Sequence, residues 1–275
     1  MSPGSTTPGA AAAESLLAFW AEAGVDCMLL DEAIDRIALG RIVPPRAPER
    51  RAGPAPVAQA PAAALTPDIA TALAEARRLA AAAPDLEALK AAIEAFDGCP
   101  LKFEGAARQS VFYRGALDAP LMVIGEGPGQ EEDLRGEPFV GRAGQLLDRM
   151  LGAAGLTGRV FITNSVFWRP PGNRNPTPAE QMVCAPFLER AVALLQPKML
   201  LLVGAPASKA MLKREDGILA LRGRWFEWRS EDGAIELPAM PTLHPAFLLR
   251  QPAAKKKAWS DLLTLTERLD RPHRG

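Results

Sequence analysis

The sequence LMVIGEGPGQEED, residues 121–133, joins a short apolar run to a loop rich in glycine and carboxylates. The apolar run predicts a buried strand, and the loop then lies at its carboxyl end, where open α/β sheets place their ligands. Glycines after a strand often bind phosphate through backbone N–H groups. Here, however, four carboxylates between residues 126 and 133 would repel a phosphate. The loop therefore predicts a site for a different kind of ligand.

Apolar runs and helical patterns alternate along the rest of the chain. Four runs predict strands: Leu121–Ile124, Val160–Thr163, Met199–Val203 and a run ending at Pro241–His244. Four segments between and after them have the pattern of helices: Gly144–Ala154, Pro178–Leu195, Ala205–Lys213 and Ala253–Leu269. A hairpin turning at Asp232-Gly233 precedes the fourth strand. The alternation predicts an α/β fold with a mainly parallel four-stranded sheet, covered by helices on both faces.

Composition and charge narrow the class of protein. At 275 residues and zero formal net charge, the chain can bury a full core but is not a strongly basic nucleic-acid binder. Its three cysteines, Cys27, Cys99 and Cys184, fit reduced thiols better than a disulfide framework. The N-terminus lacks the features of a signal peptide, and no apolar run approaches the ~20 residues that cross a bilayer. We therefore expect a soluble cytoplasmic monomer.

Composition also divides the chain into three parts. Residues 1–42 contain apolar positions at helical spacing and predict a helical appendage. Residues 43–67 are rich in proline and alanine, which predicts an extended linker. Residues 68–275 form the predicted main domain, which opens with two alanine-rich helices between Asp68 and Phe96.

Polar side chains follow each predicted strand. Glu126 and Glu132 follow the first strand, Asn164 the second and His244 the fourth. Because the carboxyl ends of parallel strands meet at one edge of a sheet, these groups predict a single crevice, with Phe139 nearby in sequence. The crevice suits a small planar polar ligand rather than a triphosphate. No single one of these residues would be diagnostic, so the prediction depends on their joint occurrence.

Several motifs in a fixed order resemble the family 4 uracil-DNA glycosylases. They span roughly residues 96–269: GEGPGQEEDLRGEPFVGRAGQLLDRML, TN, RPPGNRNPTP, LVG and HPAFLLRQP. The resemblance implies a three-layer α/β/α sandwich and an enzyme of base excision repair. Such an enzyme flips uracil out of single- or double-stranded DNA and hydrolyses its N-glycosidic bond, leaving an abasic site. The alternatives are a non-catalytic or a covalent uracil- or damage-binding module on the same fold.

The resemblance also implies which residues bind and cleave. Uracil would contact Gly127, stack on Phe139, pair along its edge with Asn164 and receive a hydrogen bond from a neutral His244. The catalytic set would be Glu126, Glu132 and His244. Glu126 would act on water or the sugar, and Glu132 would lie in the pocket and help to exclude thymine.

DNA contacts are expected around the same loops. The residues expected at DNA are Arg142, Gly204, Leu248, Leu249 and Arg250, with the two leucines wedging into the base stack and backbone amides near Gly204 binding phosphate. Arg169, Arg174 and the run Lys255–Lys257 would complete a positive rim.

One part of the family pattern is missing. Typical members bind an iron-sulfur cluster through four cysteines, in two pairs. This chain keeps Cys99 and Cys184 but has Phe96 and Trp168 where their partners would stand. Aromatic side chains do not ligate iron. Cys27 supplies at most a third ligand, so we expect no cluster and no metal.

Overall fold

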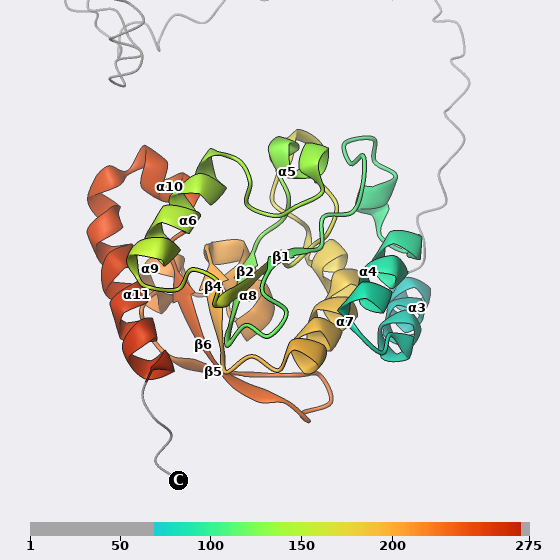
Figure 1. Ribbon diagram of the computed structural model, residues 1–275. Helices are drawn as coiled ribbons and strands as arrows, with labels where there is room; N and C mark the ends of the chain where they lie inside the picture. Colours follow the sequence, from blue (N-terminus) through green and yellow to red (C-terminus); the bar gives the residue numbers. More distant parts are fainter. Residues whose placement is uncertain (1–68, 271–275) are drawn as a thin grey trace, which may run out of the picture. The chain divides into compact units, whose positions relative to one another are not determined.

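The structure is a computed structural model that describes residues 69–270 (Figure 1). The predicted helical appendage (1–42) and linker (43–67) lie outside the described residues, so these two assignments stay predictions. Within the described part, no helix is both long enough and apolar enough to cross a membrane.

The described residues form one sheet with the order β1-β3-β2-β4-β6-β5. Its strands are β1 (Tyr113–Gly115), β2 (Leu121–Gly125), β3 (Val160–Asn164), β4 (Met199–Val203), β5 (Phe226–Arg229) and β6 (Glu236–Thr242). The four predicted strands are confirmed as the parallel centre, β3-β2-β4-β6. The predicted count of four was wrong, because an antiparallel strand is added at each edge. One of them, β5, is the first arm of the predicted hairpin.

Nine α-helices accompany the sheet within the described residues. They are α3 (Ile69–Ala82), α4 (Leu86–Ala95), α5 (Gln130–Arg135), α6 (Arg142–Ala153), α7 (Pro178–Leu195), α8 (Ala205–Leu212), α9 (Ile218–Leu221), α10 (Pro245–Arg250) and α11 (Lys255–Leu269). The predicted bounds of α7 are confirmed at both ends. The short helices α5 and α10 replace what the sequence predicted as loops after the first and fourth strands.

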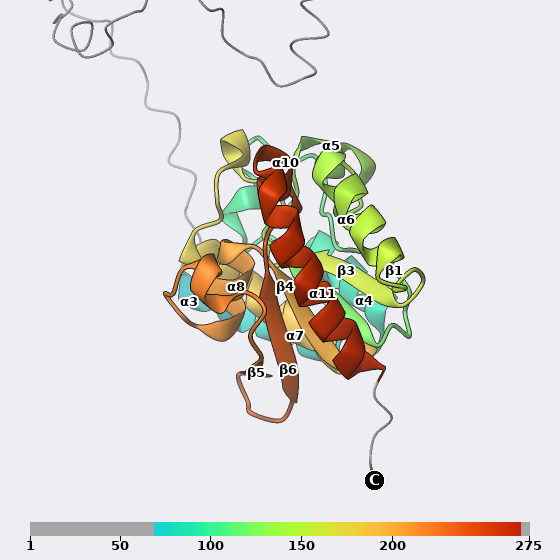
Figure 2. The ribbon, with the colours of Figure 1, turned by 90° about the vertical axis from the view of Figure 1, so that its left-hand side faces the viewer.

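Helices cover both faces of the sheet, which confirms the sandwich (Figure 1, Figure 2). Along β2, Leu121 and Val123 point into a core shared with α6 and α11. Met122 and Ile124, which alternate with them, point into the opposite core, shared with α3, α4 and α7. Every residue of β2 is buried, and full burial contributes roughly 1.5–3 kcal/mol for each Leu or Ile side chain. The central strands are thus held from both sides.

The register of the parallel strands brings their carboxyl ends to one edge. Gly125 at the end of β2 pairs with Asn164 at the end of β3, and Val203 of β4 pairs with Thr242 of β6. The chain runs from β2 to β3 on one side and later to β4 on the other, so the strand order reverses at β2. Such a reversal leaves a crevice at the carboxyl ends of the strands.

Candidate active site

A cavity of about 770 Å³ opens at this edge of the sheet. All four loops after the parallel strands contribute to it, together with α9. Its lining includes eight residues that the sequence predicted for the site: Glu126, Gly127, Glu132, Phe139, Asn164, Gly204, His244 and Arg250. The five residues expected to share one crevice, Glu126, Glu132, Phe139, Asn164 and His244, all line this cavity. The roles of all eight residues stay predictions.

Phe139 and Asn164 both line the cavity, and both side chains approach Gly125 closely. A Cβ atom on Gly125 would lie 2.4 Å from the Phe139 ring and 2.5 Å from Asn164 Oδ1. Only glycine therefore fits at position 125. The Phe139 ring is 6% exposed, and its centroid lies 5.8 Å from that of the His244 ring at an angle of 32°.

His244 is held as a neutral hydrogen-bond donor. Its Nδ1 accepts the backbone N–H of Ala246 at 3.2 Å, so the ring proton of the neutral form is on Nε2. Burial and, to a smaller extent, the nearby Arg250 together lower the pKa of His244 to about 4, while Glu132 opposes them. Gly204, with φ 92°, packs against the ring, and a Cβ there would lie 3.1 Å from the Cβ of His244. The ring is neutral at physiological pH.

Glu126 is a second cavity residue whose acidity is strongly altered. Burial raises the pKa of its carboxyl to about 7. A carboxyl group with this pKa exchanges protons near neutral pH, as a general base or acid must.

Glu132 differs from Glu126 because backbone amides occupy both of its carboxylate oxygens. Its Oε2 accepts the N–H of Gly129 at 3.1 Å, and its Oε1 accepts those of Val140 and Gly141 at 3.0 and 2.9 Å. The carboxylate thus ties the start of α5 to the segment that carries Phe139. This arrangement indicates a structural task for Glu132 within the cavity wall.

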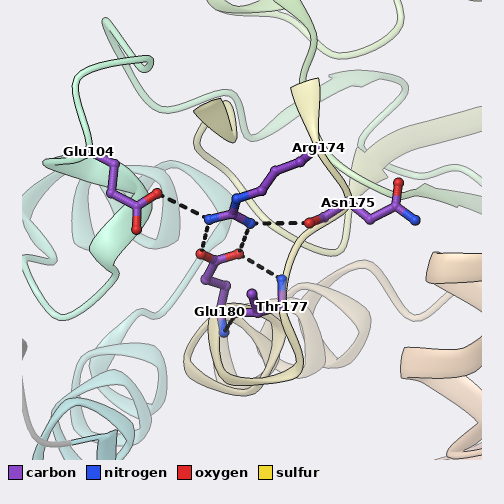
Figure 3. Close-up of polar contacts among 5 residues, drawn as sticks. All are labelled: Glu104, Arg174, Asn175, Thr177 and Glu180. Atoms are coloured by element: carbon purple, nitrogen blue, oxygen red, sulfur yellow. Dashed lines mark hydrogen bonds and ion pairs between the residues drawn. The ribbon is translucent and has the colours of Figure 1, made fainter. Parts of the chain in front are cut away.

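The loop between β3 and α7 lines the cavity with Asn173 and Asn175, which the sequence did not single out. Figure 3 shows that Arg174, between them, points the other way, to Glu104 and Glu180. Its guanidinium donates to both oxygens of Glu180, at 2.9 and 2.6 Å. The expectation that Arg174 faces DNA is therefore wrong, since carboxylates engage its guanidinium.

Glu180 is itself part of the cap of α7. Its side chain is 5% exposed and accepts the N–H of Thr177 at 2.7 Å, while Thr177 Oγ1 accepts the N–H of Glu180 at 3.3 Å (Figure 3). This reciprocal pattern is a capping box, which satisfies two N–H groups at the start of a helix. The loop is thus fixed to α7 at one end.

The residues predicted to contact DNA divide into two groups. Arg250 at the cavity and Arg142 at the start of α6 are exposed. Leu248, however, is 0% exposed and packs with Leu243, because HPAFLLR forms helix α10 and turns this side chain inward. The expectation that Leu248 enters the base stack is therefore wrong, while Leu249 is half-buried.

The expected phosphate contact of the Gly204 amide also needs correction. The N–H of Gly204 donates to the carbonyl of Thr242 at 2.9 Å, so this donor is not available for a phosphate. Apolar residues that were not predicted from the sequence also line the cavity, among them Ile218, Leu219 and Phe247. Leu219 is 66% exposed. No motif pointed to α9, because an exposed leucine has no signature in sequence.

Comparison with known proteins decides the family. A family model described as "Uracil DNA glycosylase superfamily" matches residues 112–263. The chain belongs to this superfamily. The Type-4 uracil-DNA glycosylase of Pyrobaculum aerophilum is 36% identical over 184 residues, which cover 65% of this chain and 91% of that protein. That of Thermotoga maritima is 36% identical over 167 residues, which cover 60% and 83%.

The superfamily match contains every predicted site residue from Glu126 to Arg250. It does not reach Phe96 and Cys99, which lie on the opposite side of the sheet from α6 and α11.

The position expected for an iron-sulfur cluster in this superfamily member is filled by side chains. Phe96 and Trp168 are 1% and 2% exposed, with ring centroids 6.4 Å apart, and Phe187 packs against Phe96 at 5.1 Å. Cys99 and Cys184 are buried beside them, and burial together with a hydrogen bond to Cys99 raises the pKa of the Cys184 thiol. Between residues 69 and 270, no three His, Cys, Asp or Glu side chains are grouped as metal ligands. This donor set does not fit a four-thiolate cluster.

Proposed function

We propose that this superfamily member excises uracil from DNA by hydrolysing the N-glycosidic bond and leaves an abasic site. The observation that carries the proposal is the neutral His244, whose Nε2–H is the proton left for a ligand in a cavity that also holds Phe139, Asn164 and Glu126. The relatives named Type-4 uracil-DNA glycosylases support the same activity.

Recognition would begin with a nucleotide flipped out of the duplex, at a cost of a few kcal/mol in lost stacking and pairing. Stacking of the base on Phe139 offsets part of that cost. The Asn164 side chain can donate to uracil O4 and accept from uracil N3–H. Cytosine presents a donor and an acceptor in the reverse order, so the same amide disfavours it. Gly127 also lines the cavity, and a Cβ atom there would lie 2.9 Å from the Val166 side chain, so glycine suits this part of the wall.

Cleavage would place opposite charges on the base and the sugar. The electron pair of the C1′–N1 bond leaves with uracil, and the Nε2–H of His244 stabilises the resulting anion at O2. The ionised form of Glu126 stabilises the oxocarbenium character of the sugar. Water then attacks C1′, and Glu126 accepts its proton. We assign Glu132 a positioning role in place of the predicted catalytic one, because three backbone amides hold its oxygens.

We further propose a monomeric cytoplasmic enzyme without an iron-sulfur cluster. Both described cysteines are free thiols, which fits the reducing cytoplasm. In the region where a cluster would otherwise bind, packing of the Phe96 and Trp168 side chains stabilises the fold.

Gel analysis of uracil-containing oligonucleotides tests the activity. We expect single- or double-stranded substrates to yield free uracil and alkali-labile abasic sites, while matched oligonucleotides with thymine or cytosine stay intact. A protein that retards the uracil strand without releasing base would instead be a binding module. A denaturant-resistant protein–DNA band would indicate covalent capture. Either result would contradict the proposed hydrolysis.

A further inference from the structure

Phe139 has a backbone conformation that residues with side chains rarely adopt. Its φ is 55°, in the left-handed region, which is unfavourable unless surrounding contacts hold it. The ring is nevertheless buried at the cavity, against Gly125 and facing His244. The contacts of residues 138–141 therefore decide where this ring lies.

Arg114 holds the carbonyl groups of this segment. Its Nε donates to the carbonyl of Pro138 at 2.7 Å, and its Nη2 donates to that of Phe139 at 3.1 Å. The Phe139 carbonyl also lies against Gly144 in the first turn of α6, where a Cβ atom would come within 1.6 Å of the oxygen. The carbonyl is thus fixed between a guanidinium group and a helix backbone.

Glu132 holds the amide groups of the same segment, through the N–H groups of Val140 and Gly141. The Arg114 cation therefore binds the carbonyls of Pro138 and Phe139, and the Glu132 anion binds the amides of Val140 and Gly141. Hydrogen bonds to charged groups are stronger than those between neutral groups. Together they can hold the backbone in a conformation that a phenylalanine does not favour by itself.

The position of Arg114 is itself well determined. It is the central residue of the edge strand β1, opposite Ile162 of β3. Its side chain is 22% exposed, and its Nη2 forms an ion pair with Asp148 of α6 at 2.6 Å. The guanidinium thus connects the sheet edge, α6 and the segment of Phe139.

We infer that Arg114 is a positioning residue of the uracil site, which holds Phe139 in its left-handed conformation and so keeps the ring in place as a preformed surface for the base. The inference rests on the proposed function. Arg114 does not line the cavity, so it acts on the base through Phe139 alone. The strand that carries it, β1, was not predicted from the sequence.

Single-turnover excision and DNA affinity of Arg114→Ala and Arg114→Lys test this role. We expect Arg114→Ala to lower the maximal excision rate about tenfold, with the DNA Kd changed less than about twofold, because phosphate contacts dominate affinity. Lysine keeps the charge but lacks the forked guanidinium that donates to two carbonyls. The excision rate of Arg114→Lys should therefore lie between those of the wild type and Arg114→Ala. Arg159→Ala, which removes an ion pair with Asp270 remote from the site, is the matched control and should keep the wild-type rate.

A double-mutant cycle separates positioning from general stability. In a Phe139→Ala background, Arg114→Ala should lower the rate no further, because the group through which it acts is gone. Losses that add in full would overturn the inference, since Arg114 would then act on the reaction by another route.

Hydrogen exchange measured by mass spectrometry gives a readout that does not need the activity. In Arg114→Ala, the peptide that covers residues 137–141 should exchange faster than in the wild type, while peptides from β2 and β4 should not change. Wild-type exchange in this peptide would overturn the inference even if the enzyme excises uracil. Faster exchange in a protein whose wild type excises nothing would support the contact and refute only the proposed function.

Discussion

Burial acts on two ionisable residues of the cavity in opposite senses. It raises the pKa of Glu126 to about 7 and lowers the pKa of His244 to about 4, because in each case the charged form is the one disfavoured. Above pH 7, Glu126 is ionised and His244 is neutral. This is the pair of states that the proposed cleavage requires, with an anion beside the sugar and a neutral donor beside the base.

The excision rate should therefore rise with pH through about 7. If ionised Glu126 is the active form, the single-turnover rate increases about tenfold from pH 6 to pH 8 and then levels off, since the ionised fraction changes by that factor. Glu126→Gln should lower the rate and abolish this dependence. Glu131→Gln, which alters an exposed carboxylate in the following helix α5, should preserve both. A rate that falls as pH rises through 7 would contradict the assignment.

Residue identities in the site were predictable, but their surroundings were not. Glu126, Asn164 and His244 each lie at or just beyond the carboxyl end of a parallel strand, so the parallel sheet was sufficient to bring them together. The contacts of Arg114 depend on residues 24 and 25 positions away along the chain. The sequence contains no periodic pattern that reports such a contact.

At the scale of elements, the short segments after the strands decide how the site is built. The sequence predicted loops where α5 and α10 form, because helices of six residues leave little periodicity to detect. The consequence was largest at Leu248, which the helix turns into the core. The loop from β3 to α7 is likewise ordered by a charged contact, that of Arg174 with Glu180.

Removing that contact should destabilise the protein. Breaking a buried ion pair costs roughly 3–5 kcal/mol, and because Arg174 is 38% exposed we expect a smaller loss, about 2 kcal/mol, in the free energy of unfolding of Arg174→Ala. Urea denaturation measures it. Arg174→Ala combined with Glu180→Gln should regain part of the loss, because no uncompensated charge is then buried. A double variant no more stable than Arg174→Ala would show that the pair is not what stabilises the loop.

At the scale of the whole molecule, the strands buried on both faces were the easiest part to predict. Their unbroken apolar runs alternate with helical segments, and this pattern is typical of buried parallel strands. The three-residue strand β1 was missed because so short a segment has no detectable alternation. Phe96 and Trp168 stand where cysteines are expected from the family resemblance, and their side chains pack into an aromatic cluster with Phe187.

Protein purified without oxygen should therefore be colourless and folded, and should contain no stoichiometric iron or sulfide. The two described cysteines are too few for a cluster that needs four thiolates or close substitutes. Elemental analysis and the visible absorption spectrum measure this directly. About four irons per chain in such a preparation would show that other groups complete the site and that the ligand count is wrong.

The most direct test of the uracil site is single-turnover excision by His244→Ala and Asn164→Ala, measured beside DNA affinity and thermal unfolding. We expect each variant to lose at least about a hundredfold in rate, as when one donor to a developing anion is removed, with Kd for uracil-containing DNA nearly unchanged. Thermal unfolding close to that of the wild type would show that the fold is intact. Wild-type excision rates in both variants would contradict the assignment of this cavity as the site of uracil cleavage.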